Sequence, residues 1–256
     1  LEEQAKKRTL HIFTFCYKDG ADLRILKSEL KNDHTVVFFS FAGKQYSYRL
    51  NGYGDHLVQT ISGVVAAMHS MGVSLNDTCK HIGEFHLLSG RGRVEDISLM
   101  SQHGDNINIT IMDDSYNAAP ESMAYGIKAF TSNPYIKGRR WMVLGDMLEL
   151  GSDSIEAHKR MNFAVENSSP YGVLLFGQFM SYLYQELLNK NNQLNKLMHY
   201  NDIDILCKDL YALLQDGDAV FIKGSRGQWA SKGRMAKVID YLKSMNQDDQ
   251  DERLMA

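Results

Sequence analysis

The sequence is short of cysteine and of long apolar runs, and both shortages exclude classes of protein. Its 256 residues contain only three cysteines, which lie far apart without the spacing of a metal site. Such cysteines are typical of reduced thiols in a cytosolic protein. No run of about 18 apolar residues occurs, so no membrane span is predicted. A secretory signal is also absent, and we therefore expect a cytoplasmic protein.

An excess of charge of one sign is lacking as well. The formal net charge is -3, which gives no indication of non-specific binding to nucleic acid or to an anionic membrane. Hydrophobic residues make up 44% and charged residues 23%, as in a soluble globular protein of one large or two modest domains. The first residue is Leu1, so we expect the natural N-terminus to lie upstream.

The first third of the chain has the patterns of strands followed by helices. "LHIFTF" predicts a strand over 10–15, and "HTVVFFSFAGKQYSYRL" predicts a hairpin over 34–50 because residue character alternates on both arms. Helical periodicity covers 55–72, with Gly72 as a C-cap, and a second helix over 74–85 is capped by Ser74 or Asn76. The glycine-rich, charged stretch "LLSGRGRVED" predicts a domain boundary between residues 88 and 89.

After this boundary the pattern changes to alternating strands and helices. Short apolar strands that alternate with helices predict an α/β domain with a mostly parallel sheet covered on both faces. The predicted strands cover 107–114, 140–146, 171–177, 196–200 and 218–224, and the predicted helices cover 120–132, 154–168, 178–190, 203–216 and 234–245.

Polar segments follow three of these strands. They read "DDSYN", "GDMLELG" and "KGSRG". Because ligands bind at the carboxyl ends of strands in open α/β sheets, we expect these segments to form one site. Taken singly, each could instead cap a helix or form a turn. The residues expected along this edge are Asp113, Asp114, Asn117, Asp146, Glu149, Lys223, Ser225 and Arg226.

The adjacent carboxylates Asp113 and Asp114 are predicted to have different roles. Neighbouring side chains at a strand end point in opposite directions, so one can cap the next helix while the other faces the crevice. A carboxylate in the crevice can accept two hydrogen bonds from a vicinal diol, as acidic residues do with ribose in nucleotide sites. A phosphate loop of the form G-x-x-x-x-G-K-[ST] does not occur in the sequence.

The combined motifs resemble those of the Mur ligases. "DDSYNAAPESM", "VLGDMLELG" with His158 downstream, and "KGSRG" match in order and spacing, roughly over 90–245. "GDHLVQTISGVVAAMHSMGVSL" resembles the end of the family's central ATPase domain. The resemblance implies that residues 1–88 are the last part of the central domain, without its phosphate loop. Residues 89–256 are then the Rossmann-like C-terminal domain.

Within the family, the motifs are most similar to those of the member that adds D-alanyl-D-alanine to UDP-N-acetylmuramoyl-tripeptide in peptidoglycan synthesis. The resemblance implies that ATP phosphorylates the peptide carboxylate and that the dipeptide amine attacks the acyl phosphate. The family's phosphate loop, Mg²⁺ ligands and carbamylated lysine are expected upstream of Leu1. We therefore expect no catalytic residue and no metal ligand in this chain, and no activity from it alone.

The resemblance also implies two sets of binding residues. Arg91 lies at the hinge and contacts the nucleotide, Asp114 binds the ribose hydroxyls, and the remaining nucleotide-binding residues are Tyr116, Asn117 and His56. The substrate-binding residues are Asp146, Glu149, His158, Lys223, Ser225 and Arg226. Of these, Lys223 and Arg226 hold a carboxylate or neutralise phosphate.

Several positions depart from the family pattern. Residue 119 is Ala where the family has Asn, residue 57 is Leu, and residue 60 is Thr in place of an Asn that reads adenine. "QWASK" adds residues after "KGSRG". These changes fit a divergent active ligase, or a non-catalytic Rossmann-like binding module derived from one. Another Mur-type or a folylpolyglutamate-type ligase is disfavoured, since those carry other residues at "SYNA" and "GDMLELG".

Overall fold

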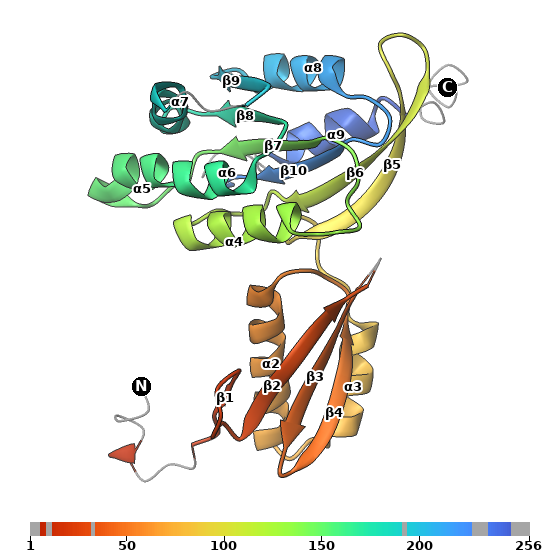
Figure 1. Cartoon of the computed structure of the whole chain (residues 1–256), viewed down its shortest axis with the longest axis vertical. Helices are drawn as coiled ribbons and strands as arrows, with labels where there is room; N and C mark the ends of the chain where they lie inside the picture. The colour runs from red at the N-terminus through yellow and green to blue at the C-terminus, as the bar shows by residue number, and fades with distance from the viewer. Residues whose placement is uncertain (1–5, 9–11, 32–33, 191–193, 227–234, 247–256) are drawn as a thin grey trace. The chain divides into compact units, whose positions relative to one another are not determined.

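The chain folds into two compact units. A computed structural model describes all residues except 1–5, 9–11, 32–33, 191–193, 227–234 and 247–256. The units are Leu1–Leu87 and Leu88–Ala256 (Figure 1). No helix in the described part of the chain is both long and apolar enough to cross a bilayer.

In its described residues, the first unit is a four-stranded sheet with two helices. Its strands β1 (Phe15–Cys16), β2 (Leu23–Leu30), β3 (Thr35–Phe41) and β4 (Lys44–Leu50) lie in chain order. β1 is parallel to β2, and the other pairs are antiparallel. The helices are α2 (Asp55–Ser70) and α3 (Leu75–Glu84). Alternate residues of β3, Val37 and Phe39, are fully buried in the core.

Most local expectations for this unit are confirmed. The predicted hairpin forms β3 and β4, and Ser74 caps α3 by accepting a hydrogen bond from the Asp77 N–H (3.1 Å). Gly72 has a φ of +90°, as a residue after a helix end often does. The strand predicted over 10–15 is wrong for residues 12–14, because pairing with β2 begins only at Phe15. Residues 10 and 11 lie outside the described residues.

The second unit contains a six-stranded sheet in the order β5-β6-β10-β7-β8-β9. The mostly parallel sheet is confirmed, since only β5 pairs in the antiparallel direction. β5 was not predicted, because it lies partly in the stretch that was taken as the boundary. The strands are β5 (Arg93–Met100), β6 (Asn106–Asp114), β7 (Arg140–Gly145), β8 (Gly172–Phe176), β9 (Lys196–Tyr200) and β10 (Ala219–Lys223).

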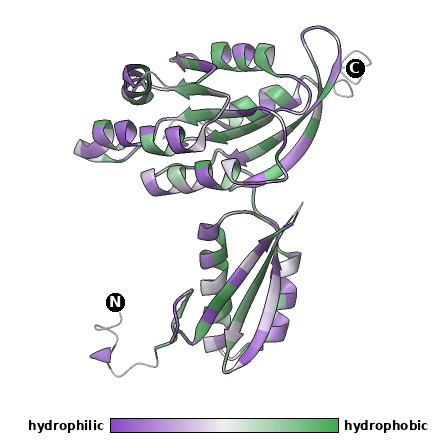
Figure 2. Cartoon of the chain, in the orientation of Figure 1, coloured by the Kyte–Doolittle hydropathy of each residue, from purple (hydrophilic) through white to green (hydrophobic). Residues whose placement is uncertain are grey.

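Helices cover both faces of this sheet (Figure 1). α4 (Pro120–Thr131), α5 (Ser154–Arg160), α6 (Asn162–Ser168) and α7 (Met180–Asn189) pack on one face. α8 (Ile203–Leu213) and α9 (Ala236–Lys243) pack on the other. The central strands are buried on both sides, and they are hydrophobic along their length (Figure 2). The single helix predicted over 154–168 is two helices, which meet at Met161.

The order of strands places the three polar segments next to one another. β10 lies between β6 and β7, with Lys223 in register with both Asp114 and Leu144. The chain leaves β6 and β7 towards the face covered by α4 and α5, but it leaves β10 towards the face covered by α9. Such a reversal between neighbouring strands is where open α/β sheets bind ligands.

Substitution of two glycines can show how tightly the second unit is packed at the amino ends of these strands. Gly138 has a φ of +66°, and a Cβ there would lie 2.1 Å from the Gly217 carbonyl oxygen. Gly104 also has a positive φ, +85°, but a Cβ there would have no described atom within 4 Å. Gly104→Ala should therefore cost only the roughly 1–2 kcal/mol of a left-handed alanine. Gly138→Ala should cost about 1–3 kcal/mol more, because the backbone must move. Chemical unfolding of both variants measures the difference, and equal losses would contradict the close approach.

Candidate functional site

Asp113, at the end of β6, is a buried carboxylate that binds four donors. Its side chain is 3% exposed. Oδ2 accepts hydrogen bonds from the Gly90 N–H (2.8 Å) and the Ser89 hydroxyl (3.1 Å). Oδ1 accepts from the Ser115 N–H (3.1 Å) and the Ser115 hydroxyl (2.6 Å). Asp113 therefore fastens the segment before β5 to the segment after β6.

Neither aspartate caps the next helix, which corrects the expectation from sequence. α4 begins at Pro120 after Ala119, and the Ala119 N–H donates to the Ser122 hydroxyl (3.0 Å). The alternation of the two side chains is nevertheless present. Asp113 binds residues beside β5, whereas Asp114 points to the face that α4 covers.

Gly90 allows the two segments to meet. Its φ is +81°, and a Cβ there would lie 3.0 Å from the Tyr116 nitrogen. The Tyr116 N–H donates to the Gly90 carbonyl (3.0 Å), and the Gly92 N–H donates to the Asp113 carbonyl (2.7 Å). This backbone pairing brings Arg91 against the ring of Tyr116, with 4.2 Å between the guanidinium carbon and the ring centroid.

Asp114 forms an ion pair with Lys223 across the neighbouring strands. Lys223 Nζ donates to Asp114 Oδ2 (2.6 Å) and to the Asn117 carbonyl (3.0 Å). The lysine side chain is 3% exposed and that of the aspartate 18%. Burial raises the pKa of the Asp114 carboxyl above its usual value, and Lys223 opposes this shift. The structure thus brings together Asp114, Asn117 and Lys223, as the sequence predicted.

Tyr116 presents an exposed aromatic ring beside two cations. Its side chain is 42% exposed. Arg91 lies at 4.2 Å from the ring centroid and Arg226, from the segment after β10, at 5.8 Å. Guanidinium groups near an aromatic face are held there by cation–π attraction. This arrangement can bind an anionic or planar group.

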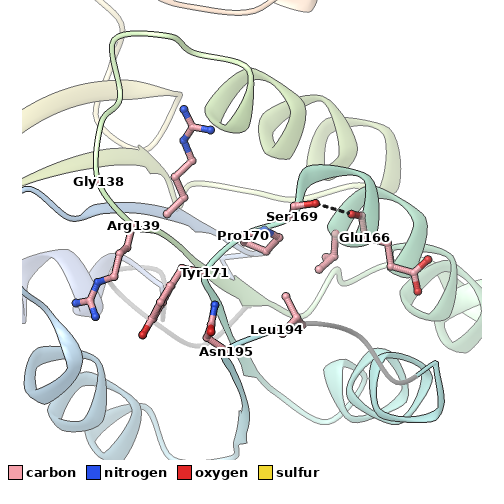
Figure 3. Close-up of a pocket in the computed structure, with 10 residues that line it drawn as sticks. Gly138, Arg139, Glu166, Ser169, Pro170, Tyr171, Leu194 and Asn195 are labelled. Carbon is pink, nitrogen blue, oxygen red and sulfur yellow. Dashed lines mark hydrogen bonds between the residues drawn. The ribbon is translucent and has the colours of Figure 1, made fainter.

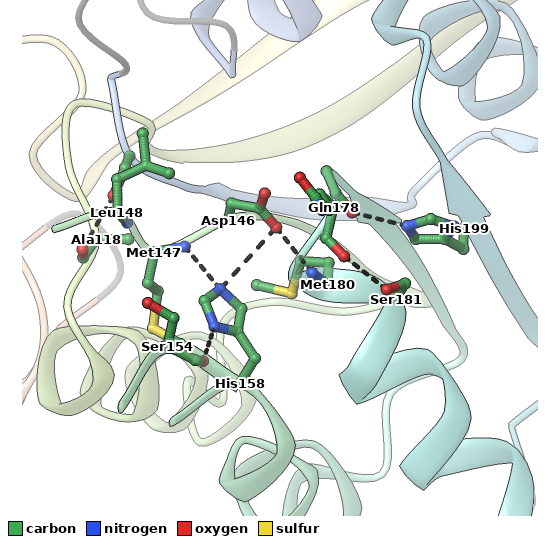
Figure 4. A network of polar contacts seen from close by, with 12 residues as sticks. Ala118, Asp146, Met147, Leu148, Ser154, His158, Gln178, Met180, Ser181 and His199 are labelled. Carbon is green, nitrogen blue, oxygen red and sulfur yellow. Dashed lines mark hydrogen bonds and ion pairs between the residues drawn. The ribbon is translucent and has the colours of Figure 1, made fainter. Parts of the chain in front are cut away.

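Asp146, at the end of β7, lies at the start of another helix. Its Oδ1 accepts a hydrogen bond from the N–H of Met180, the first residue of α7 (2.8 Å). A carboxylate at a helix N-terminus is stabilised by the helix dipole. Gly177 leaves space for it, since a Cβ there would lie 2.4 Å from Asp146 Cγ. Figure 4 shows Asp146 between Met180 and His158.

His158 is fully buried, and both ring nitrogens are bonded (Figure 4). Nε2 accepts from the Met147 N–H (2.9 Å), so Nδ1 carries the proton and donates to the Ser154 carbonyl (2.6 Å). Burial lowers the pKa of His158, against the opposing effects of the Ser154 carbonyl and Asp146. The geometry therefore makes His158 a support for the 146–149 segment, with no ring nitrogen left for a substrate.

Ser225 connects all three strand ends. Its N–H donates to the Asp146 carbonyl (2.9 Å), and its hydroxyl donates to the Ala118 carbonyl (3.1 Å). The same hydroxyl accepts from the Leu148 N–H (3.0 Å). Glycines allow this approach, since a Cβ on Gly224 would lie 2.9 Å from the Gly145 Cα. Ser225 thus joins the "DDSYN" and "GDMLELG" segments.

Glu149 is exposed and has a left-handed backbone. Its φ is +64°, which is uncommon for a residue other than glycine and costs free energy. It lies in the same segment as Asp146, directly after residues that Ser225 and His158 hold. The exposed carboxylate of Glu149 is therefore carried by a turn whose preceding residues are held by hydrogen bonds.

His56 belongs to the first unit, near the start of α2. Its carbonyl accepts a hydrogen bond from the Thr60 hydroxyl (2.9 Å). The only hydroxyl proton of Thr60 is therefore engaged within its own helix. While this hydrogen bond is present, the Thr60 hydroxyl cannot donate to an adenine ring.

Some residues of the site were not found from sequence. Ser89 and Gly90 bind Asp113, and the start of α7 binds Asp146. The glycines of "SGRG" indicated a close approach of the backbone at Gly90. The partner of each contact lies more than 20 residues away in the sequence, so no local pattern predicts it. "QWASK" lies outside the described residues. Within the described residues, no group of three or more His, Cys, Asp or Glu side chains could hold a metal ion.

A pocket of about 620 Å³ lies at the opposite edge of the sheet, before β7, β8 and β9 (Figure 3). Its lining includes Arg139, Tyr171 and Asn195, and none of the predicted site residues. Arg139 donates to both carboxylate oxygens of Asp218 (2.8 and 2.7 Å) and lies over the Tyr171 ring (4.7 Å). Its charge is thus neutralised within the protein, and we assign no function to this pocket.

Comparisons with known proteins agree on one family. The family model of the Mur ligase glutamate ligase domain matches residues 99–226, half of the chain. The chain is 22% identical over 231 residues to UDP-N-acetylmuramoyl-tripeptide--D-alanyl-D-alanine ligase of Rickettsia prowazekii, covering 90% of this chain and 47% of that protein. It is 26% identical over 214 residues to the ligase of the same name from Bacillus subtilis, covering 84% and 45%.

A solved structure shares the fold. The MurF ligase from Thermotoga maritima in complex with ADP is similar with a TM-score of 0.68 and 20% identity, over 98% of this chain and 52% of that one. The chain thus spans about half the length of the relatives it matches.

The neutral state of His158 predicts a pH dependence of stability. Its pKa is lower in the folded than in the unfolded chain, so below about pH 6.5 the unfolded chain binds more protons. The free energy of unfolding should therefore decrease as the pH is lowered through this range, by at most about 1.4 kcal/mol per pH unit from this residue.

His158→Gln keeps an acceptor for Met147 but cannot be protonated. Chemical unfolding at pH 7.5 and at pH 5.5 measures the decrease in the free energy of unfolding between these two values. The decrease should be smaller in this variant than in the wild type. His81→Gln, at a side chain that is 70% exposed, serves as the control. An unchanged loss in His158→Gln would contradict the assignment.

Proposed function

Since the chain belongs to the Mur ligase family, we propose that it forms part of an ATP-dependent amide ligase that adds D-alanyl-D-alanine to UDP-N-acetylmuramoyl-tripeptide in peptidoglycan synthesis. Two of the relatives carry this activity in their names. The observation that supports it most directly is the meeting of "DDSYN", "KGSRG" and "GDMLELG" at adjacent strand ends. We propose a cytoplasmic enzyme, for which free thiols are in keeping.

The end of β6 is the proposed nucleotide side of the site. Asp114 is proposed to accept hydrogen bonds from the ribose hydroxyls, and Arg91 to contact the nucleotide from its position on the Tyr116 ring. Asn117 lies beside Asp114 through their shared contact with Lys223. The structure of the MurF ligase from Thermotoga maritima is a complex with ADP, which supports an adenine nucleotide as ligand.

The ends of β7 and β10 are the proposed substrate side. Glu149 is an exposed carboxylate suited to the dipeptide amine, and Arg226 is a cation suited to its carboxylate or to the acyl phosphate. Asp146, Ser225 and His158 would act through position, because each is bonded within the protein. These side chains would orient two reactants, which is the main contribution that a protein makes to such a transfer.

ATP and Mg²⁺ are proposed as the cofactors. The Asp114 carboxylate and the exposed Arg91 guanidinium group over the Tyr116 ring fit a nucleotide, whereas the described residues offer no cluster for a metal ion. Mg²⁺ would neutralise phosphate charge, and we expect its ligands upstream. His56, on the first unit, is proposed to lie on the adenine side, where Thr60 replaces the asparagine of the family.

A non-catalytic binding module derived from a ligase is the second candidate. The engaged Thr60 hydroxyl and the alanine at position 119 favour it, since both positions lack an amide found in the family. The coding sequence upstream of Leu1 distinguishes the two candidates. A phosphate loop and a lysine there would support the ligase, whereas a start codon near Leu1 would support the module.

The 256 residues alone should neither hydrolyse ATP nor form the amide bond. The sequence has no phosphate loop, and phosphoryl transfer depends on positioning and charge stabilisation of the γ-phosphoryl group. Phosphate release is measured with UDP-peptide and D-alanyl-D-alanine present. Release above the background without protein would contradict this prediction.

In the full-length enzyme, substitution of either aspartate should lower stability, because Asp114→Asn leaves the buried Lys223 ammonium unpaired, but only substitution of Asp114 should weaken ATP binding. Asp114→Asn removes a charge from the proposed ribose contact, so the KM for ATP should rise about 10- to 100-fold, for a loss of roughly 1.5–3 kcal/mol. Asp113→Asn leaves a buried donor without its acceptor, so unfolding should become easier by about 1–3 kcal/mol with little change in KM. If the two variants exchanged these effects, the assignment of roles would be wrong.

A further inference from the structure

The contact between Lys223 and Asp114 leaves one carboxylate oxygen available. Lys223 Nζ occupies Oδ2 (2.6 Å), and among the described residues no hydrogen bond involves Oδ1. A second contact, to the Asn117 carbonyl (3.0 Å), fixes the direction of the ammonium group. The carboxylate is therefore held in one orientation, with its second oxygen unused.

Asp114 lies in surroundings that oppose its charge. α4 passes over it, because Gly126 has no side chain and a Cβ there would lie 3.3 Å from Oδ2 and 2.6 Å from Phe221 Cζ. The charged groups that act on it are Asp113 on the same strand, Lys223 on β10 and Arg91 before β5. Burial and Asp113 raise the pKa of Asp114, and only the two cations lower it. Of the two, Lys223 is in direct contact.

From this geometry we infer that Lys223 is a positioning residue, which keeps Asp114 ionised and directs its free oxygen to the ligand, and that it does not itself bind substrate. A side chain that is 3% exposed and already bonded to two groups can reach a ligand only by giving up these bonds. This assignment differs from the sequence-based expectation that Lys223 holds a carboxylate or phosphate. It rests on the proposed nucleotide role of Asp114.

The first test follows the carboxyl group of Asp114 directly, by carbon-detected NMR of the 256-residue chain over a range of pH. In Lys223→Met the Asp114 carboxyl should titrate at a higher pH than in the wild type, since the attracting charge is gone. The matched control is Lys237→Met, which removes a lysine that pairs with Asp204 (2.7 Å) at an exposed place in the same unit. It should leave the Asp114 titration unchanged. An unchanged titration in Lys223→Met would overturn the inference, because a lysine that only supports the Asn117 carbonyl would not affect it.

The second test measures the KM for ATP of the full-length enzyme between pH 7 and 9. Lys223→Met should raise it about tenfold or more at pH 7, and the increase should shrink as the pH rises and Asp114 ionises. If the titration moves but the KM does not, the inference about Lys223 stands and the proposed role of Asp114 fails.

Lys223→Met could fail to fold, because it leaves a buried charge unpaired. The double variant Asp114→Asn/Lys223→Met removes both charges and should then fold. Its recovery would show that Lys223 serves the charge of Asp114, and its failure would overturn the inference.

Discussion

The placement of β10 between β6 and β7 is the constraint on which the site depends. It puts Lys223 in register with Asp114 on one side and Leu144 on the other. Segments that are more than 70 residues apart in the sequence then meet within hydrogen-bonding distance, as in the contact of Ser225 with Leu148 (3.0 Å). If β10 lay elsewhere in the sheet, none of the three polar segments would have these partners.

Four ionisable groups at this edge are stabilised in four different ways. Asp113 is surrounded by neutral donors, and Asp114 by a lysine. Asp146 lies at the start of a helix, and burial favours the neutral form of His158, whose Nε2 accepts a hydrogen bond from a backbone N–H. Each solution offsets the cost of removing a polar group from water. Together they hold the loops before any ligand binds, so that the exposed groups Tyr116, Glu149 and Arg226 have fixed supports.

Much of the second unit could be predicted from sequence, because most of its strands are short, rich in apolar residues and separated by helices. β5 could not, since it is an edge strand whose polar residues, such as Glu95 and Asp96, resemble those of a loop. β1 is only two residues long and could not be located by alternation. The break at Met161 was also hidden, because both helices continue the same apolar periodicity across it.

For the site, the sequence predicted which residues meet but not what each one does. The strand ends are local features, whereas the role of a side chain depends on partners that the fold supplies. His158 and Lys223 show the difference, since the sequence indicated substrate binding for both, and only the fold reveals the partners within the protein to which both are bonded. The same reasoning separates Asp113 from Asp114. They are identical and adjacent, but the pleat of β6 turns one towards the N–H of Gly90 and the other towards the ammonium group of Lys223. The chemistry of this edge thus depends on which face of the sheet each carboxylate occupies, and that is fixed by the register of β6 against β5 and β10.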